Sequence, residues 1–183
     1  NNDPSRLTFR AGDSTLQLQL PLKKVKWRKK DGKLRADYGP YAFVYSLLTY
    51  KRRTTGIKEE IIIKKRTAAK AQFKFPLSSK DLKLREEENT WRFINQQGEE
   101  VFYIPKPYMV DAAGNRSEKV ELEFVSSSPN SKLSNYLIIK PSQEWLRDPA
   151  REYPVTIDPT LKLSILDVHS HPQTGDTWKV RFE

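Results

Sequence analysis

His169 and His171, the two histidines of the chain, lie in one short string, VHSHPQTGD, and their type and spacing could serve zinc chemistry. Histidine nitrogens bind zinc, and a catalytic zinc needs three protein ligands with a fourth position open for water. The nearest carboxylates, Asp167 and Asp176, could complete only a weak site. The string therefore needs a third strong ligand before it predicts a metal centre.

The string H-S-H-P resembles the start of the zinc motif of JAMM-type metalloproteases. In that motif a serine follows the proline by seven residues and a metal-binding aspartate follows it by ten, but this chain has Lys179 and Phe182 there. Pro172 and Gly175 are typical of a loop between two strands. We therefore expect a solvated loop, with no metal and no cofactor.

Adjacent carboxylates at Glu59-Glu60 and in the run from Glu86 to Glu88 could supply the acid and base of a glycosidase. Such catalysis needs two carboxylates that converge from different elements, about 5 to 9 Å apart. Neighbouring residues of a strand point to opposite faces, so Glu59 and Glu60 cannot form that pair together. We expect outward charges that balance nearby lysines.

Asp111 and Asn115 enclose a short glycine-containing stretch, DAAGN, that could bind Ca²⁺ through oxygen atoms. Calcium takes six to eight oxygen ligands, and this stretch lacks the further acids of an EF-hand loop. A plain turn is the better interpretation.

The elements that position these residues are short strands. Runs rich in β-branched and aromatic residues recur between turn signals, and no apolar pattern keeps helical spacing for three turns. In LQLQL (16–20) the leucines point to one face and the glutamines to the other, and KVELEFV (119–125) repeats this alternation. About a dozen short strands, including Lys24 to Arg28 and Tyr41 to Tyr50, suit two packed sheets. The predicted fold class is an all-β, antiparallel β-sandwich.

Turn and helix signals are few. Asp31-Gly32 and Gln96-Gln97-Gly98 are typical of hairpin turns. One short helical turn is expected near 142–147, where Ser142 can cap it and Pro149 can end it.

The composition limits size and class. At 183 residues, with 37% apolar residues and a net charge of +10, the chain can form one domain with a core and a strongly basic surface. Cysteine is absent, which excludes disulfides, thiolate metal sites and cysteine nucleophiles. No apolar run approaches the roughly 18 residues of a membrane span, so we expect no membrane insertion.

Basic residues are concentrated in a few runs. The stretch from Lys23 to Lys33, KKVKWRKKDGK, holds seven basic residues and one acid, and further runs lie at 51–53 and 64–66. On a strand, Lys24, Lys26 and Arg28 would share one face while Trp27 turns to the core. Such a face could follow phosphates or sulfates, or could protect an edge strand from pairing with other chains. The candidate polyanion-binding residues are Lys24, Lys26, Arg28, Lys30, Lys51, Arg52 and Arg53.

The string PSQEWLRDPAREYPVTIDPT, at 141–160, resembles a segment of large secreted bacterial proteins that carry YD or RHS repeats or DNRLRE modules. GIKEEIIIK (56–64) and YIPKPYMVD (103–111) are similar to two further landmarks of the same region, in the same order. The resemblance covers about residues 40 to 160. It implies an extracellular or cell-surface modular protein whose partners are neighbouring modules of the same polypeptide, and it assigns no catalytic or binding residues.

The chain departs from this family pattern after Thr160, because no DNRLRE-type module begins there. Residues 161–183 are similar to the first two strands of an immunoglobulin-like spacer. We therefore expect a β-sandwich module over 1–160, followed by the first strands of a spacer or a C-terminal hairpin over 161–183.

Two functions remain open. The first is a non-catalytic structural or presentational module of a surface protein, which is not an enzyme because no catalytic constellation is present. The alternative is a binding module whose basic strand engages an anionic polymer, either cell-wall glycan or nucleic acid. A hydrolase would require carboxylates from distant strands to converge in a cleft.

Overall fold

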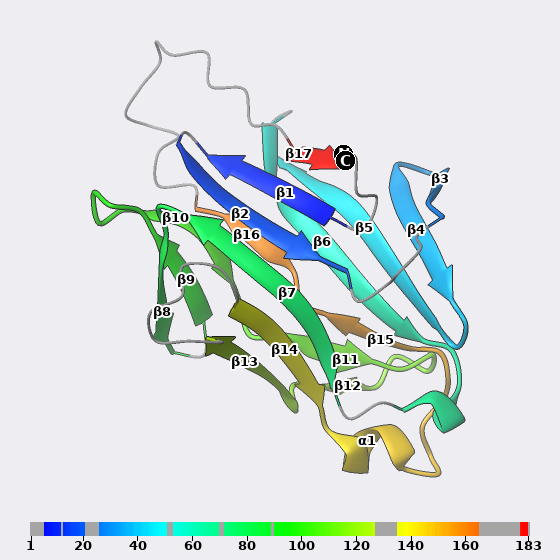
Figure 1. Ribbon diagram of the computed structural model, residues 1–183. Helices are drawn as coiled ribbons and strands as arrows, with labels where there is room; N and C mark the ends of the chain where they lie inside the picture. Colours follow the sequence, from blue (N-terminus) through cyan, green and yellow to red (C-terminus); the bar gives the residue numbers. More distant parts are fainter. Residues whose placement is uncertain are drawn as a thin grey trace.

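The computed structural model describes residues 6–11, 13–20, 26–50, 53–69, 72–88, 90–126, 135–164 and 180–182. In this part of the chain two antiparallel sheets pack face to face, which confirms the predicted all-β sandwich. Figure 1 shows the smaller sheet as the layer in front of the larger one. None of the helices in these ranges is long and apolar enough to span a membrane.

The smaller sheet has six described strands in the order β13-β14-β7-β2-β1-β17. They are β1 (Arg6–Ala11), β2 (Ser14–Gln19), β7 (Phe73–Lys80), β13 (Val120–Ser126), β14 (Asn135–Pro141) and β17 (Val180–Phe182). On β2 the predicted alternation is present, because Leu16 and Leu18 are buried while Gln17 and Gln19 are half-buried.

The larger sheet has eleven described strands and divides at β6. One edge of β6 pairs with β5, which leads to β4 and β3, while the other edge pairs with β15 and β16 at successive positions. The strands are β3 (Arg28–Lys30), β4 (Lys33–Tyr38), β5 (Tyr41–Tyr50), β6 (Arg53–Ile63), β8 (Lys83–Glu87), β9 (Thr90–Ile94), β10 (Glu100–Ile104), β11 (Tyr108–Val110), β12 (Arg116–Ser117), β15 (Val155–Asp158) and β16 (Leu161–Leu163).

The core lies between the sheets and consists mostly of inward residues of the alternating strands. Phe43 of β5 and Phe75 of β7 meet edge to face across the interface, with ring centroids 6.2 Å apart. Each side chain is nearly inaccessible, and burial of one such side chain stabilises the fold by about 1.5 to 3 kcal/mol. Ile61, Ile63 and Val155 extend the same core.

The predicted turns and helix are present. Asp31 and Gly32 both have positive φ (50° and 73°) in the hairpin between β3 and β4, and Gly98 has φ 87° after β9. A 3-10 turn (Arg66–Ala68) follows β6. The helix α1 (Gln143–Arg147) is capped by Ser142, whose hydroxyl accepts a hydrogen bond from the Trp145 amide at 3.3 Å.

The basic strand differs from its prediction. Residues 21–25 lie outside the described ranges, and Lys26 and Trp27 precede the strand, which begins only at Arg28. Its hairpin partner, β4, follows the predicted Asp31-Gly32 turn, but its bounds were not predicted, because the run KLRADY has few apolar residues.

The C-terminal part contributes to both sheets. β16 pairs with β6 and β10 in the larger sheet, and β17 pairs with β1 in the smaller one. Strands from both sides of residue 160 therefore lie in the same sheets. The division at residue 160 stays a prediction, since strand pairing alone does not fix a domain boundary.

Candidate functional site

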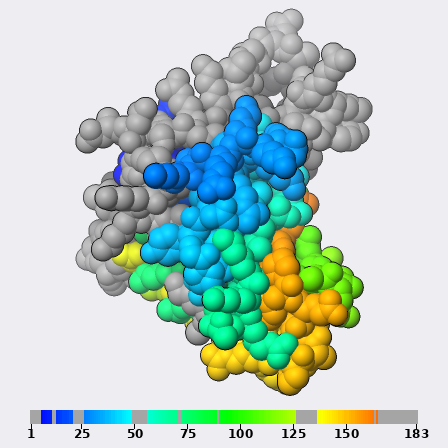
Figure 2. All heavy atoms as spheres, turned by 90° about the vertical axis from the view of Figure 1, so that its right-hand side faces the viewer, coloured from blue at the N-terminus to red at the C-terminus, as the bar shows by residue number. Residues whose placement is uncertain are grey.

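The main concentration of charge lies on the hairpin formed by β3 and β4. From Lys26 to Tyr38 the chain has six basic residues and two acids. Arg28 lies opposite Arg35, and Lys30 lies opposite Lys33, so the register brings cations together in rows across the strands. The hairpin is the blue region on the face seen in Figure 2, and β3 is the last described strand of this branch of the sheet.

The cations nearer the sheet centre are neutralised. Arg35 binds Asp37 with two hydrogen bonds of 2.9 and 3.1 Å, and Lys64 lies 2.7 Å from the same carboxylate. Hydrogen bonds from Arg35 and then Lys64 hold the pKa of Asp37 well below its usual range. This end of the hairpin is therefore a closed charge network.

A second charge network lies on β6 and its neighbours. Lys58 contacts Glu60 at 3.0 Å and Asp158 at 3.3 Å, and Lys33 reaches Glu60 at 3.7 Å. Tyr108 donates a hydrogen bond of 2.8 Å to Asp158. Glu60 thus points outward and balances lysines, as expected.

The outermost cations lack such partners among the described side chains. Arg28, Lys29 and Lys30 are exposed along the whole of β3, and Lys26 is exposed just before it. No acid with a described side chain forms an ion pair with any of these four.

Trp27 anchors this strand to the core. The side chain is half-buried and meets Tyr45 edge to face, with ring centroids 5.7 Å apart. The predicted inward orientation is confirmed, so Trp27 does not offer an open ring face for stacking on a base.

The other predicted site residues are only partly covered. Lys24, Lys51 and Arg52 lie outside the described ranges, and Arg53 begins β6 with only its backbone described. β6 has eleven residues, so Arg53 at its start and Lys64 just after its end are separated by a strand about 33 Å long. The histidine loop also lies outside the described ranges.

A buried carboxyl group lies on β6, two strands from β4 in the same sheet, and its burial was not predicted from the sequence. Glu59 is 4% exposed and accepts a hydrogen bond of 2.5 Å from the Tyr45 hydroxyl. Burial raises the pKa of Glu59 to about 7, although the hydrogen bond from Tyr45 opposes the shift. The signal was present in the sequence, because Ile57, Glu59 and Ile61 alternate onto one face. The expectation of an outward Glu59 is therefore wrong.

The candidate calcium loop forms a turn at residues 112–113. The Asp111 carboxylate accepts hydrogen bonds from the Asn115 backbone and side chain and from Arg151, all between 2.8 and 3.2 Å. Its oxygens are therefore already used within the protein. Across the described part of the chain, no three His, Cys, Asp or Glu residues are placed to hold a metal ion.

Of the comparisons with known proteins, only the comparison with curated sequences found relatives. No family model matches the chain. No solved structure matches it either. The chain is 33% identical over 118 residues to the tRNA nuclease WapA of Bacillus subtilis strain 168, a match that covers 60% of this chain and 5% of that protein. Equally long matches, at 33% and 32% identity, are the tRNA(Glu)-specific nuclease WapA of B. subtilis subsp. natto BEST195 and the tRNA3(Ser)-specific nuclease WapA of Bacillus spizizenii.

These relatives correct two expectations from the sequence. The chain was expected to be a non-catalytic structural module and not an enzyme, whereas the relatives that it matches are named as nucleases. The alternative, a module that binds nucleic acid, agrees better with those names. The chain spans only 5% of the length of these relatives.

Proposed function

We propose that the β3–β4 hairpin binds RNA phosphates, and that the chain is a segment of a longer protein that acts on tRNA. The observation that carries the proposal is the row Arg28, Lys29 and Lys30 along β3, with Arg28 and Lys30 on one face and Lys29 on the other; all three are exposed and have no acidic partner among the described side chains. Names of the relatives support tRNA as the nucleic acid.

The geometry favours contacts with the sugar-phosphate backbone. Cations that displace condensed counterions from phosphates bind strongly at low salt and weakly at high salt. Trp27 is turned toward Tyr45, and Tyr38 at the end of β4 is the one exposed aromatic of the hairpin, so the hairpin presents charge without a row of stacking aromatics. Binding should therefore show little base preference, since phosphate contacts position a protein but do not read sequence.

The resemblance of 141–160 to secreted modular proteins supports a place for this segment at the cell surface. The small share of the relatives' length that the chain covers, 5%, agrees with one segment among many. Detection of an epitope within this segment on intact cells that express the longer protein would test this placement.

The test is a salt titration of tRNA binding, measured by fluorescence anisotropy with the whole chain. A variant with Arg28→Gln, Lys29→Gln and Lys30→Gln removes the row. A matched control, Lys80→Gln, Lys83→Gln and Arg85→Gln, removes the same charge from exposed positions on β7 and β8. Because each phosphate contact contributes about 0.7 to 0.9 to the slope of log K against log salt, the first variant should lower that slope by about 2.

Three outcomes decide the proposal. Selective loss in the β3 variant supports the hairpin as the RNA site. Equal loss in both variants means that only the net charge matters, and stronger binding to an anionic cell-wall polymer than to tRNA would assign the row to glycan. Gel analysis of the same mixtures shows whether the segment itself cleaves tRNA.

A further inference from the structure

One edge of the smaller sheet is unpaired in the described part of the chain. β13 pairs with β14 on one side, through seven consecutive residue pairs with no bulge, and no other described strand pairs with it. Proteins usually protect such an edge with a proline, a bulge or charged side chains. β13 has no proline or bulge, and its charges, Glu121 and Glu123, alternate with the inward residues Val120, Leu122 and Phe124.

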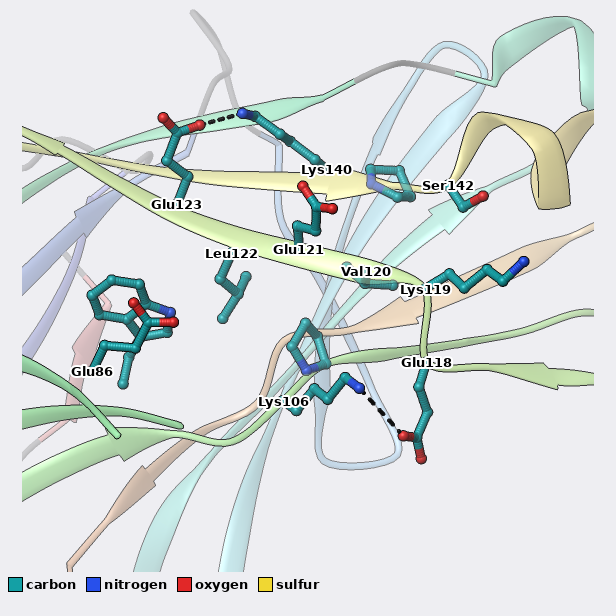
Figure 3. Close-up of a pocket in the computed structure, with 13 residues that line it drawn as sticks. Glu86, Lys106, Glu118, Lys119, Val120, Glu121, Leu122, Glu123, Lys140 and Ser142 are labelled. Carbon is teal, nitrogen blue, oxygen red and sulfur yellow. Dashed lines mark ion pairs between the residues drawn. The ribbon is translucent and has the colours of Figure 1, made fainter. Parts of the chain in front are cut away.

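A groove runs along this edge. Its volume is about 790 Å³, within the range of about 300 to 1,000 Å³ that is usual for ligand clefts. Val120 and Leu122, from the inner face of β13, line it together with Glu121 and Glu123 from the outer face. Figure 3 shows Leu122 on one side of the strand and the two glutamates on the other. Because both faces of β13 contribute to the lining, the groove reaches around this strand, and it also includes Lys140 and Pro141 of β14.

The two sides of the groove differ in chemistry. On the inner side, Trp91 and Pro107 lie with Leu122 and form an apolar wall. Trp91 packs against Phe124, with ring centroids 4.5 Å apart, which fixes the position of this wall.

The outer face of β13 carries two glutamates. Lys106 and Lys119 also line the groove, but they pair with Glu118 and Glu144. Glu121 and Glu123 lie two residues apart, or about 7 Å, on the same face of the strand. Lys140 forms an ion pair with Glu123, but no ion pair to Glu121 or to Glu86 is present among the described side chains. Two carboxylates thus share one lysine, which leaves negative charge beside the free backbone.

From this arrangement we propose that β13 accepts an additional strand from a partner polypeptide, and that this strand alternates basic and apolar residues. Its backbone would pair with the free N–H and C=O groups of β13, as in other cases of strand addition. Its apolar residues would lie against Trp91 and Leu122, and its basic residues beside Glu121 and Glu123. This inference is independent of the RNA proposal, because it uses the smaller sheet and none of the residues of the basic hairpin.

The experiment uses a blocked synthetic peptide, KVKVKVK, with the whole chain. Binding is measured by calorimetry, and hydrogen exchange of the β13 amides is followed by NMR. A scrambled peptide, KKKVVVK, has the same charge and composition without alternation. We expect protection of alternate β13 amides by the first peptide and at least tenfold weaker binding of the second.

Charge reversal makes the test specific. Glu121→Lys combined with Glu123→Lys should invert the preference, so that EVEVEVE binds and KVKVKVK does not. The matched control, Glu99→Lys with Glu152→Lys, changes exposed acids outside the groove and should bind KVKVKVK as the wild type does.

Several results would overturn the proposal. These are equal binding of the scrambled peptide, unchanged exchange at β13, and the same loss of binding in the control variant. A wild-type chain that is already dimeric, with β13 amides protected before any peptide is added, would instead assign the edge to a second copy of the chain.

Discussion

Tyr45 donates a hydrogen bond of 2.5 Å to Glu59 in the core of the sandwich, on the two strands that follow the basic hairpin in the larger sheet. The two residues are register partners on β5 and β6, and Trp27 packs against the same tyrosine. Burial raises the pKa of Glu59 to about 7, and burial followed by the Glu59 charge raises the pKa of Tyr45 well above its usual value. The folded chain therefore holds a proton on Glu59 under conditions in which the unfolded chain releases it.

This proton predicts a pH dependence of stability. Glu59 has a pKa near 4.5 when unfolded and about 7 when folded, so its contribution is fully present below pH 4.5 and is lost as the pH rises to about 7. The loss amounts to roughly 3 kcal/mol. In Glu59→Gln the amide carries no charge, and the fall in the free energy of unfolding over this window should disappear. Urea unfolding of both proteins at several pH values measures this change in the free energy of unfolding.

The control for this prediction is Glu60→Gln, which changes the neighbouring outward carboxylate. That variant should keep the wild-type slope between pH 4.5 and 7. Asp37 has a lowered pKa, so its contribution is lost only at more acidic pH and does not enter this window. If Glu59→Gln and the wild type show the same slope, Glu59 does not hold the proton.

The ion pair of Asp111 and Arg151 gives a second prediction. Their atoms are 2.8 Å apart, and the two side chains are 0% and 10% exposed. Although burial opposes it, hydrogen bonds from Asn115 and Arg151 keep the pKa of Asp111 below its usual value. Asp111→Ala would leave the guanidinium, stacked on Trp145, with only the more exposed Asp148 carboxylate at 3.6 Å, and should lower the free energy of unfolding by about 3 to 5 kcal/mol.

An exposed pair provides the comparison. Glu118 and Lys106 lie 3.6 Å apart, with side chains 59% and 47% exposed. Glu118→Ala should cost less than about 1 kcal/mol, because water screens such pairs. Chemical unfolding of both variants measures the difference, and similar losses in the two would show that the Asp111 pair is not a buried anchor.

Alternation made much of the fold readable from the sequence. β5 was predicted with the bounds that the structure shows, because Phe43 and Tyr45 mark its inner face clearly. The strand β8 could not be predicted in this way, since all five of its residues are exposed and no apolar period remains. Pairing with β9 forms β8, and that information lies in another part of the chain.

The candidate sites also differ in whether local sequence or the tertiary fold creates them. The exposed cations of β3 were found because clustered charge is visible in the sequence. Glu59 was missed because the strand register overrides the usual preference of glutamate for water. The groove beside β13 was also beyond prediction, since Trp91 and Leu122 meet only when β9 and β13 close the same end of the sandwich.

Gly56 provides the third prediction, because β16 passes very close to it. A Cβ atom at this position would lie 2.6 Å from the Leu161 carbonyl oxygen and 3.0 Å from the Lys162 Cα. Both neighbours are backbone atoms, so they cannot move away as a side chain would. Gly56→Ala should therefore destabilise the chain by about 1 to 3 kcal/mol and loosen the pairing of β16 with β6.

Hydrogen exchange locates this effect. In Gly56→Ala the amides of 161–163 should lose protection, whereas those of β13 and β14 should keep it. Gly98→Ala is the control, since a Cβ there meets nothing within 4 Å and only the positive φ of 87° is strained. That variant should lose stability without a local change at β16. Unchanged protection at 161–163 in Gly56→Ala would show that the pairing of β16 with β6 does not depend on this close approach. Residues 161–163 could then detach from the sandwich without loss of its stability.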